Sequence, residues 1–492
     1  MMTQLPALQV VIPLLAALLC AFMKRGTVAW AMSLIASWAV LVVSILILQQ
    51  VLESGPISYA MGGWEPPWGI EYYIDKLNAF VLLLVSGVGA IIMPFAKRSV
   101  GTEIHSTRQP YFYTMYLLCL CGLLGIAITG DAFNIFVFLE VSSLATYAMV
   151  AMGKDKRALL AAFQYLIIGT IGATFYVIGT GLLYTVTGSL NLVDIAGQLD
   201  SVNNTRALVT ALAFLTVGIS LKLALFPLHV WLPNAYAYAP SFATVFLAAT
   251  ATKVAIYLLI RFFYSVFGAG LVFKTLPVSE ILLILSVAAM FGASIVAIFQ
   301  EDIKRMLAYS SVAQIGYITL GIALANSNGL SGGIVHIFNH AIMKAAFFLV
   351  LGAVFYRIGS VHIDQLAGIG RRMPVTMMGF VIAGMSIVGV PGTVGFVSKW
   401  YLAAGAFENG QWWLVFAIMI SSLLAVIYVG RVVEVAWFKD PSGATLEARD
   451  PPPAMLVPIL IFCAASIYFG IDTTLTAGIA SQAAELLLGG LR

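Results

Sequence analysis

The sequence predicts an all-α membrane protein that crosses the bilayer many times. Of its 492 residues, 61% are apolar and only 9% are Asp, Glu, Lys or Arg, whereas about a quarter of the residues in soluble domains are charged. The mean hydropathy is +1.00. This composition leaves too few polar residues to cover a soluble surface. It therefore excludes a cytosolic enzyme, a secreted domain and a disordered chain.

Apolar stretches that are long enough to cross a membrane occur about fourteen times along the chain. A membrane-spanning helix needs about 20 mostly apolar residues. The stretches are 1–23, 26–52, 77–96, 111–130, 131–152, 158–193, 207–230, 241–262, 281–300, 306–335, 330–356, 373–398, 409–430 and 454–471. The longest polar stretches lie near 52–75 and 437–453. Both are too short to fold as domains, so we expect loops there.

Positive charges predict how the chain is oriented in the membrane. The first cations, Lys24 and Arg25, follow the first apolar run. A signal peptide would carry them before the run, so we expect a retained helix. If residue 1 lies outside, fourteen spans place fifteen Lys and Arg residues on the cytoplasmic side and five outside. Cytoplasmic loops are enriched in Lys and Arg, so we expect both termini outside.

The sequence lacks the motifs of several other classes of protein. The chain has neither a Gly-rich loop ending in Gly-Lys-Ser/Thr nor a His-Glu-x-x-His motif, which argues against a self-contained ATP-driven pump. Its basic residues are scattered, which argues against nucleic-acid binding. The cysteines Cys20, Cys119, Cys121 and Cys463 all lie in apolar stretches. We interpret them as buried hydrophobic residues and predict no cofactor and no metal.

Function is best sought among the ionisable residues inside the predicted spans. Each such charge costs about 2.5–3.5 kcal/mol at mid-bilayer, so four lysines and one glutamate together cost on the order of 10 kcal/mol or more. Glu140 lies near the middle of the span 131–152. It is a candidate for a proton path, and the alternative is a structural ion pair.

Lys222 is the expected partner of Glu140. Pro227 follows it by five residues, and proline interrupts a helix because it lacks a backbone N–H. Interrupted helices inside membranes line cavities and often mark ion sites. His229 lies just beyond the proline. It is either a proton relay or a hydrogen-bonded structural residue.

Lys253 lies eight residues before Arg261 in the next apolar stretch. We expect Arg261 to extend toward the membrane interface, as long cationic side chains near helix ends do. Lys253 is too deep to do the same. Desolvation disfavours its charged form, which makes this lysine a candidate for proton exchange.

His336, His340 and Lys344 are spaced four residues apart. This spacing places all three on one stripe of a helix. Two imidazoles and an amine are not a typical core pattern, and histidine changes its charge near neutral pH. The stripe therefore predicts a stepwise proton route. A transition-metal site is the alternative, although no carboxylate or thiol accompanies the histidines.

Lys399 follows Pro391 and several glycines, which predict a second interrupted helix. Two such helices in corresponding places suggest an inverted repeat. The repeats would cover 111–262 and 279–436, between an N-terminal three-helix segment, 1–110, and a C-terminal loop with the last helix, 437–492. Near the end of the second repeat, Arg431 and Glu434 are three residues apart, and we expect a local ion pair.

Several blocks of residues resemble one known family. The blocks are Gly130-Asp131, Phe133-Asn134, Phe138 and Glu140-Val141; Lys222 and Phe226-Pro227-Leu228-His229-Val230-Trp231-Leu232-Pro233 with Pro240; Thr252-Lys253-Val254-Ala255-Ile256-Tyr257; Asp302-Ile303-Lys304-Arg305, Ala308-Tyr309-Ser310 and Gln314-Ile315-Gly316-Tyr317; and His340 with Lys344-Ala345-Ala346-Phe347-Phe348. They resemble the antiporter-like, proton-translocating membrane subunits of complex I, membrane hydrogenases and Mrp Na+/H+ antiporters. The likeness covers roughly residues 65–440.

The resemblance implies about fourteen helices, two inverted five-helix repeats, and functional residues at matching positions. Glu140 and Lys222 match the family's glutamate and lysine on helices five and seven. Lys253 and Lys399 match its lysines on helices eight and twelve. The implied protein is a subunit of a hetero-oligomeric complex in the cytoplasmic membrane of a bacterium or archaeon. It would transport H+ with Na+ as the counter-ion, and it would be a transporter subunit rather than an enzyme.

The loop Gly62-Gly63-Trp64, with Pro67 and Gly69-Ile70, resembles the D-type subunit of Mrp antiporters. The length and Lys399 also suit that type. Ser310-Ser311 resembles the complex I or hydrogenase branch instead, because many D-type sequences have histidine at the first position. A proton-pumping subunit of a redox complex is therefore the alternative. A structural scaffold with an inactive channel is a third hypothesis, and the deep lysines argue against it.

Overall fold

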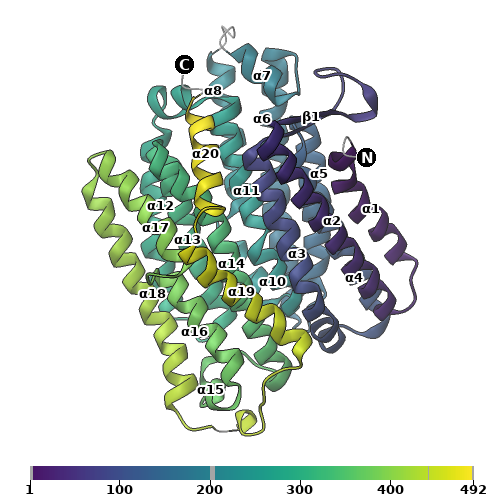
Figure 1. Ribbon diagram of the computed structural model, residues 1–492, viewed down its shortest axis with the longest axis vertical. Helices are drawn as coiled ribbons and strands as arrows, with labels where there is room; N and C mark the ends of the chain where they lie inside the picture. The colour runs from purple at the N-terminus through teal and green to yellow at the C-terminus, as the bar shows by residue number, and fades with distance from the viewer. Residues whose placement is uncertain (1–3, 200–204, 442, 490–492) are drawn as a thin grey trace.

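The computed structural model describes residues 4–199, 205–441 and 443–489, and it is almost entirely helical (Figure 1). Its α-helices are α1 (Leu5–Ala21), α2 (Gly26–Ser54), α3 (Lys76–Glu103), α4 (Gln109–Ile128), α5 (Ala132–Ala151), α6 (Arg157–Thr187), α7 (Leu192–Gln198), α8 (Thr205–Leu223), α9 (Trp231–Tyr238), α10 (Ser241–Ala249), α11 (Ala251–Ile260), α12 (Val278–Ile298), α13 (Ile303–Leu324), α14 (Ser327–Ile358), α15 (Ile369–Arg372), α16 (Pro374–Val388), α17 (Val394–Glu408), α18 (Trp412–Phe438), α19 (Pro453–Ile471) and α20 (Thr476–Gly489).

The predicted all-α polytopic fold is confirmed. Within the described residues, twelve helical segments are long and apolar enough to cross a membrane, and α1 and α16 are shorter apolar helices. The helices form one bundle whose long axis is vertical in Figure 1, and both termini lie at its upper end. α14 packs against α10, α13, α16, α17, α19 and α20. It is therefore a central helix of the bundle, and it carries the predicted histidine stripe.

Three interruptions divide helices inside the bundle. α8 ends at Leu223, ahead of Pro227, and α16 and α17 are separated by 389–393, where Gly389 has a φ of +92° and Gly392 a φ of +85°. These are the two interruptions that the prolines predict. The third lies at Thr250, between α10 and α11, where φ is −124° and ψ is −56°. No proline or glycine marks it, so the sequence did not predict it.

The region near 52–75 contains regular structure, contrary to the expectation of a loop. Strands β1 (Ile57–Ala60) and β2 (Glu71–Ile74) form an antiparallel hairpin in which Ile57 pairs with Ile74. Gly62 and Gly63 both have positive φ in the connecting segment, a conformation that glycine adopts without a steric penalty. Asn191, just ahead of α7, donates to the Glu71 carboxylate at 2.7 Å. The hairpin is thereby joined to the bundle.

Arg261 does not extend freely into solvent; its side chain ends on Asp75, directly before the first residue of α3. Arg261 is only 6% exposed, and it forms a two-pronged ion pair with Asp75, with N–O distances of 2.8 and 3.0 Å. Asp75 caps the N-terminus of α3 by accepting from the backbone N–H groups of Leu77 and Asn78. The cap holds the carboxylate toward the end of α11. Two parallel N–H···O bonds to a carboxylate make this a strong, geometrically specific pair.

The predicted ion pair between Arg431 and Glu434 is wrong. None of the ion pairs among the described residues includes either side chain. The guanidinium of Arg431 instead donates to the backbone carbonyl of Ile298. That carbonyl is at the C-terminal end of α12, where carbonyls lack partners within the helix. The contact joins α18 to α12.

We predict that Asp75→Asn destabilises the protein and changes its response to acid. Burial alone would raise the pKa of Asp75, but Arg261 and the capping N–H groups outweigh burial and hold this pKa below its usual value. A lowered pKa stabilises the fold above about pH 4, and this stabilisation is lost as the pH falls through the folded-state value. Breaking a buried pair costs about 3–5 kcal/mol.

The measurement is the thermal midpoint of the purified complex between pH 7 and pH 3. The wild type should lose stability more steeply than Asp75→Asn at the acid end. The matched control is Asp155→Asn, since Asp155 pairs with Arg157 on the exposed surface, where an ion pair contributes little. Equal effects of the two substitutions at pH 7 would contradict this prediction.

Candidate functional site

The seven predicted site residues lie on five helices inside the bundle. Four of them, Lys253, His336, His340 and Lys344, have 0% exposure, and Lys399 is 7% exposed. Among the described residues, no ion pair includes any of the four site lysines. Each ammonium is held by neutral oxygen atoms instead.

Lys222 lies next to the last residue of α8. Its Nζ donates to the Ser143 hydroxyl at 2.6 Å and to the Tyr147 hydroxyl at 3.5 Å. Glu140 lies on the same helix as both hydroxyls, about one turn before Ser143. The expected direct ion pair between Glu140 and Lys222 is therefore not formed, although the carboxylate charge acts on the lysine through space. The Oε1 atom of Glu140 is buried without a hydrogen-bond partner.

A small cavity of about 30 Å³ lies beside Lys222. Ser142, Ser143 and Thr146 line one side, and Val254 and Ala255 of α11 line another. This volume is about that of one water molecule, and the hydroxyls supply the polar partners that a buried water needs. The cavity brings Lys222 close to α11, the helix that carries Lys253.

Lys253 lies at the unpredicted interruption between α10 and α11. Its Nζ donates to the backbone carbonyl of Ala248 and lies 3.4 Å from the Thr252 hydroxyl. The carbonyl of Ala248 is near the C-terminal end of α10, where carbonyls lack helical partners. The broken helix therefore supplies the oxygen that holds the lysine.

The stripe on α14 forms as predicted. The rings of His336 and His340 are nearly parallel, with their centroids 6.0 Å apart. His336 lies 2.7 Å from the Ser398 hydroxyl and donates to the side-chain carbonyl of Gln314 at 3.0 Å. Neither ring nitrogen of His340 has a hydrogen-bond partner, although both are buried.

Lys344 completes the stripe at the far end from His336. Its Nζ donates to the backbone carbonyl of Leu307 at 2.8 Å and to the hydroxyl of Ser310. The hydroxyl of Ser310 therefore lies directly against the buried amine.

Lys399 lies beside the interruption between α16 and α17. Its Nζ donates to the carbonyls of Ile387 and Val388 at 2.8 and 2.9 Å and to the Ser422 hydroxyl at 2.8 Å. The two carbonyls belong to the last turn of α16. Lys253 and Lys399 are thus held in the same way, each by the open end of a broken helix.

Charges acting through space, rather than direct contacts, relate most of these residues to one another. The charges of Lys253 and Lys399 act on His336, and those of Lys253 and Lys344 act on His340. We call Lys253, His336, His340, Lys344 and Lys399 the central cluster. Lys222 approaches it through the small cavity. All members carry or can gain a positive charge, so a proton on one member disfavours a second proton on its neighbours.

His229 lies apart from the central cluster. Its ring packs on Phe226, with a centroid distance of 5.2 Å, and against the edge of Tyr309. Its Nδ1 atom is buried without a partner. The ring therefore fills the turn between α8 and α9, which favours the structural interpretation.

The sequence did not reveal the neutral residues that hold the charges. They are Ser143, Tyr147, Ser310, Gln314, Ser398 and Ser422. Some carried a weak signal, because Ser143 lies one turn after Glu140 and Ser398 directly precedes Lys399. The others lie on separate helices, and only the packing brings them to the lysines.

The buried cluster and the bundle agree with a known membrane family. A sequence profile described as "NADH:quinone oxidoreductase/Mrp antiporter, TM" matches residues 129–425, which is more than half of the chain. The chain belongs to this family. The matched range contains all seven predicted site residues, and the predicted family is confirmed.

Members of the family resemble this chain over nearly its whole length. The N subunit of the NADH-quinone oxidoreductase of Desulforudis audaxviator is 41% identical and covers 96% of each chain. The D subunit of the Na(+)/H(+) antiporter of Alkalihalophilus pseudofirmus is 30% identical and covers 95% of this chain and 94% of its own. A chain of the membrane-bound sulfane sulfur reductase, an archaeal respiratory membrane complex, is 31% identical, with a TM-score of 0.90 and coverage of 99% of this chain and 98% of that chain.

We predict that Ser310→Ala destabilises the complex more than Ser311→Ala does. Both hydroxyls donate to the carbonyl of Leu307 at 3.0 Å, but only Ser310 also contacts Lys344. Removing a hydrogen bond to a charged group costs about 1.5–3 kcal/mol, against about 1 kcal/mol for a neutral one. The thermal midpoint of the purified complex measures both. A larger loss for Ser311→Ala would show that Ser310 does not support the lysine.

Proposed function

We propose that this chain is the proton-translocating subunit of a multisubunit monovalent cation (Na+)/H+ antiporter. One observation carries the proposal: lysines and histidines lie inside the bundle on helices α8, α11, α14 and α17 without an ion pair to a carboxylate, and all of them except the half-buried Lys222 are buried. A purely structural role would favour paired charges, because an unpaired charge in a membrane is expensive. Groups that gain and lose protons are charged only part of the time.

The oxygen atoms around the cluster suit this chemistry. A hydroxyl can both donate and accept a hydrogen bond, so Ser143, Ser310 and Ser398 fit a lysine or histidine in either protonation state. Moving one charge through about 100 mV involves about 2.3 kcal/mol, which is about the energy of one or two ordinary hydrogen bonds. Small changes in these contacts are therefore sufficient to direct the proton.

In the proposed path, Glu140 and Lys222 form the gating pair. Lys222 now donates to Ser143, one turn from Glu140. If the Lys222 ammonium moved from the Ser143 hydroxyl to the Glu140 carboxylate, an ion pair would form and Lys222 would stay protonated. If that ion pair then broke, Lys222 would release its proton through the small cavity toward α11.

Beyond the gate, Lys253, His336, His340 and Lys344 form the central relay, and Lys399 is the terminal group on the far side. The rings of His336 and His340 stack on each other, and His340 lies one turn before Lys344 on the same stripe of α14. His336 reaches Ser398, which is adjacent to Lys399 in the chain. The two protonation sites of each imidazole allow a proton to enter at one nitrogen and leave at the other.

Sodium would cross in a partner subunit. Na+ is a hard cation that needs several oxygen ligands, and Glu140 is the only carboxylate among the proposed path residues. The name of the 30% identical relative, an Na(+)/H(+) antiporter subunit, supports sodium as the counter-ion of the complex. Other membrane subunits would then complete the transporter, and this chain itself would not be an enzyme.

A redox-driven complex is the second candidate function. It is favoured by the 41% identical relative, which is named as a subunit of NADH-quinone oxidoreductase, and by the Ser310 contact with Lys344. The proton path would be the same in this case. The chain has no set of residues that points to a redox cofactor, so electron transfer would take place in other subunits.

The proposed orientation puts both termini outside the cytoplasmic membrane of a bacterium or archaeon. The excess of Lys and Arg in the loops on the other side supports it. The proposed inverted repeats, 111–262 and 279–436, each contain one of the two interruptions that prolines mark, near Pro227 and Pro391.

We predict that Na+ collapses a pH gradient in everted vesicles that contain the whole complex, and that Lys222→Ala and Lys399→Ala abolish this response. Each substitution removes an amine from one end of the proposed path, the gate at Lys222 or the terminal group at Lys399. The matched control is Lys439→Ala, since Lys439 is an exposed lysine after α18, and it should behave as the wild type does.

The same assay separates the two candidate functions. If the wild type ignores Na+ but pumps protons when a redox donor is added, the antiporter is wrong and the redox complex is correct. If either lysine variant responds as strongly as the wild type, that lysine does not lie on the path.

A further inference from the structure

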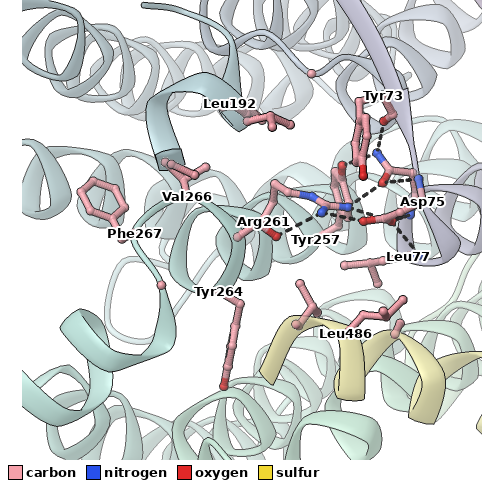
Figure 2. Close-up of a pocket in the computed structure, with 18 of the residues that line it drawn as sticks. Tyr73, Asp75, Leu77, Leu192, Tyr257, Arg261, Tyr264, Val266, Phe267 and Leu486 are labelled. Carbon is pink, nitrogen blue, oxygen red and sulfur yellow. Dashed lines mark hydrogen bonds and ion pairs between the residues drawn. The ribbon is translucent and has the colours of Figure 1, made fainter. Parts of the chain in front are cut away.

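A large cavity lies away from the central cluster. Its volume is about 630 Å³. Its lining includes residues of α7, of the start of α3 and of α20, and α7 and α20 lie in the upper part of the bundle in Figure 1. Figure 2 shows residues of α11 and the following turn on one side and Leu486 of α20 on another. We call this cavity the terminal vestibule.

One part of the vestibule wall carries polar groups that are hydrogen-bonded to one another. Tyr257 and Asn78 both line it, and the Asn78 amide donates to the Tyr257 hydroxyl at 2.8 Å. That hydroxyl also lies 3.3 Å from the backbone carbonyl of Ala127. Asn78 accepts from Arg261 at 2.5 Å. Asp75 neutralises Arg261 on this wall, while Lys76 and Lys274 also line the cavity.

The wall of the vestibule has an uncommon backbone geometry. Arg261–Val266 and Gly270–Thr275 are both π-helical, and Gly268 between them has a φ of +77°. Short π-helical segments are rare and often occur at functional sites. Here they widen the end of α11, so that the cavity reaches down to Tyr257.

Tyr257 lies one helical turn from Lys253. The two residues are four apart on α11, which puts their side chains on the same stripe, about 6 Å apart along the axis. Lys253 belongs to the central cluster and is completely buried, and Tyr257 is 2% exposed. The vestibule therefore ends about one helical turn from Lys253, a member of the central cluster.

We propose that the terminal vestibule is the water-filled port of the path on the side of the termini, and that the Tyr257 hydroxyl relays protons between it and Lys253. This inference rests on the proposed function. Lys253 would turn its flexible side chain from Ala248 toward Tyr257. Its ammonium would give one proton to the phenol oxygen as the phenol O–H gives one to a vestibule water. The lysine becomes neutral, the phenol is regenerated, and one proton leaves.

The first test is proton flux through the reconstituted whole complex with Tyr257→Phe. This change removes the relay hydroxyl and retains the ring. The matched control is Tyr264→Phe, because Tyr264 lines the same vestibule but donates away from the path, to the carbonyl of Ile322 at 2.7 Å. We expect at least a tenfold loss of flux for Tyr257→Phe and less than a twofold loss for the control.

The second test leaves Tyr257 intact. Leu486 lines the vestibule and is 61% exposed, so Leu486→Cys can be labelled by a membrane-impermeant, positively charged thiol reagent. The four native cysteines are buried, which makes the treated wild type a clean control. Labelling from the side of the termini should reduce flux at least fivefold. Labelling from the opposite side should not. This result decides the inference if Tyr257→Phe fails to assemble.

A third variant, Lys253→Ala, separates failure of the port from failure of the proposed function. If Lys253→Ala stops flux while Tyr257→Phe and labelling at position 486 leave it unchanged, the port is wrong and the path stands. If Lys253→Ala conducts protons normally, the proposed function is wrong and the port falls with it.

Discussion

The structure depends on one constraint: an amine buried in a membrane must find oxygen atoms. Intact helices offer few of them, because their carbonyls already accept from their own N–H groups; one such atom is the carbonyl oxygen of Leu307 in α13, which accepts from Lys344. This chain interrupts its helices at the depth of its lysines. The end of α10 holds Lys253, and the last turn of α16 holds Lys399. Each interruption would otherwise leave backbone carbonyls without partners, and each lysine would otherwise be a charge without partners. The interruptions and the lysines therefore stabilise each other.

This arrangement differs from an ion pair in what it allows. A carboxylate partner would favour the charged lysine strongly and hold it in one protonation state. Carbonyl and hydroxyl oxygens favour it less, so the neutral form remains accessible. Glu140 is the exception within the path, and it is one turn away from the group that Lys222 now contacts. A single acid at the gate and neutral oxygens elsewhere are consistent with control at one point and free transfer beyond it.

The sequence predicted what depends on local pattern. Hydropathy located the spans, prolines located two interruptions, and the four-residue spacing put His336, His340 and Lys344 on one stripe. The sequence did not predict contacts between segments that are far apart in the chain. Arg261 meets Asp75 across 186 positions, and Arg431 donates to a carbonyl of another helix rather than to Glu434 nearby. The interruption at Thr250 has no proline or glycine to reveal it. The hairpin near residue 60 was missed because its strands have only four residues each.

In the proposed mechanism the buried lysines exchange protons and do not only supply charge. Lys399→Arg tests this point most directly, because arginine keeps a positive charge but cannot be deprotonated in a protein. Proton flux and thermal stability of the reconstituted complex would be measured together. We expect the variant to stay folded and to lose flux. A variant that folds and conducts protons as fast as the wild type would contradict the mechanism, since a fixed charge would then be sufficient.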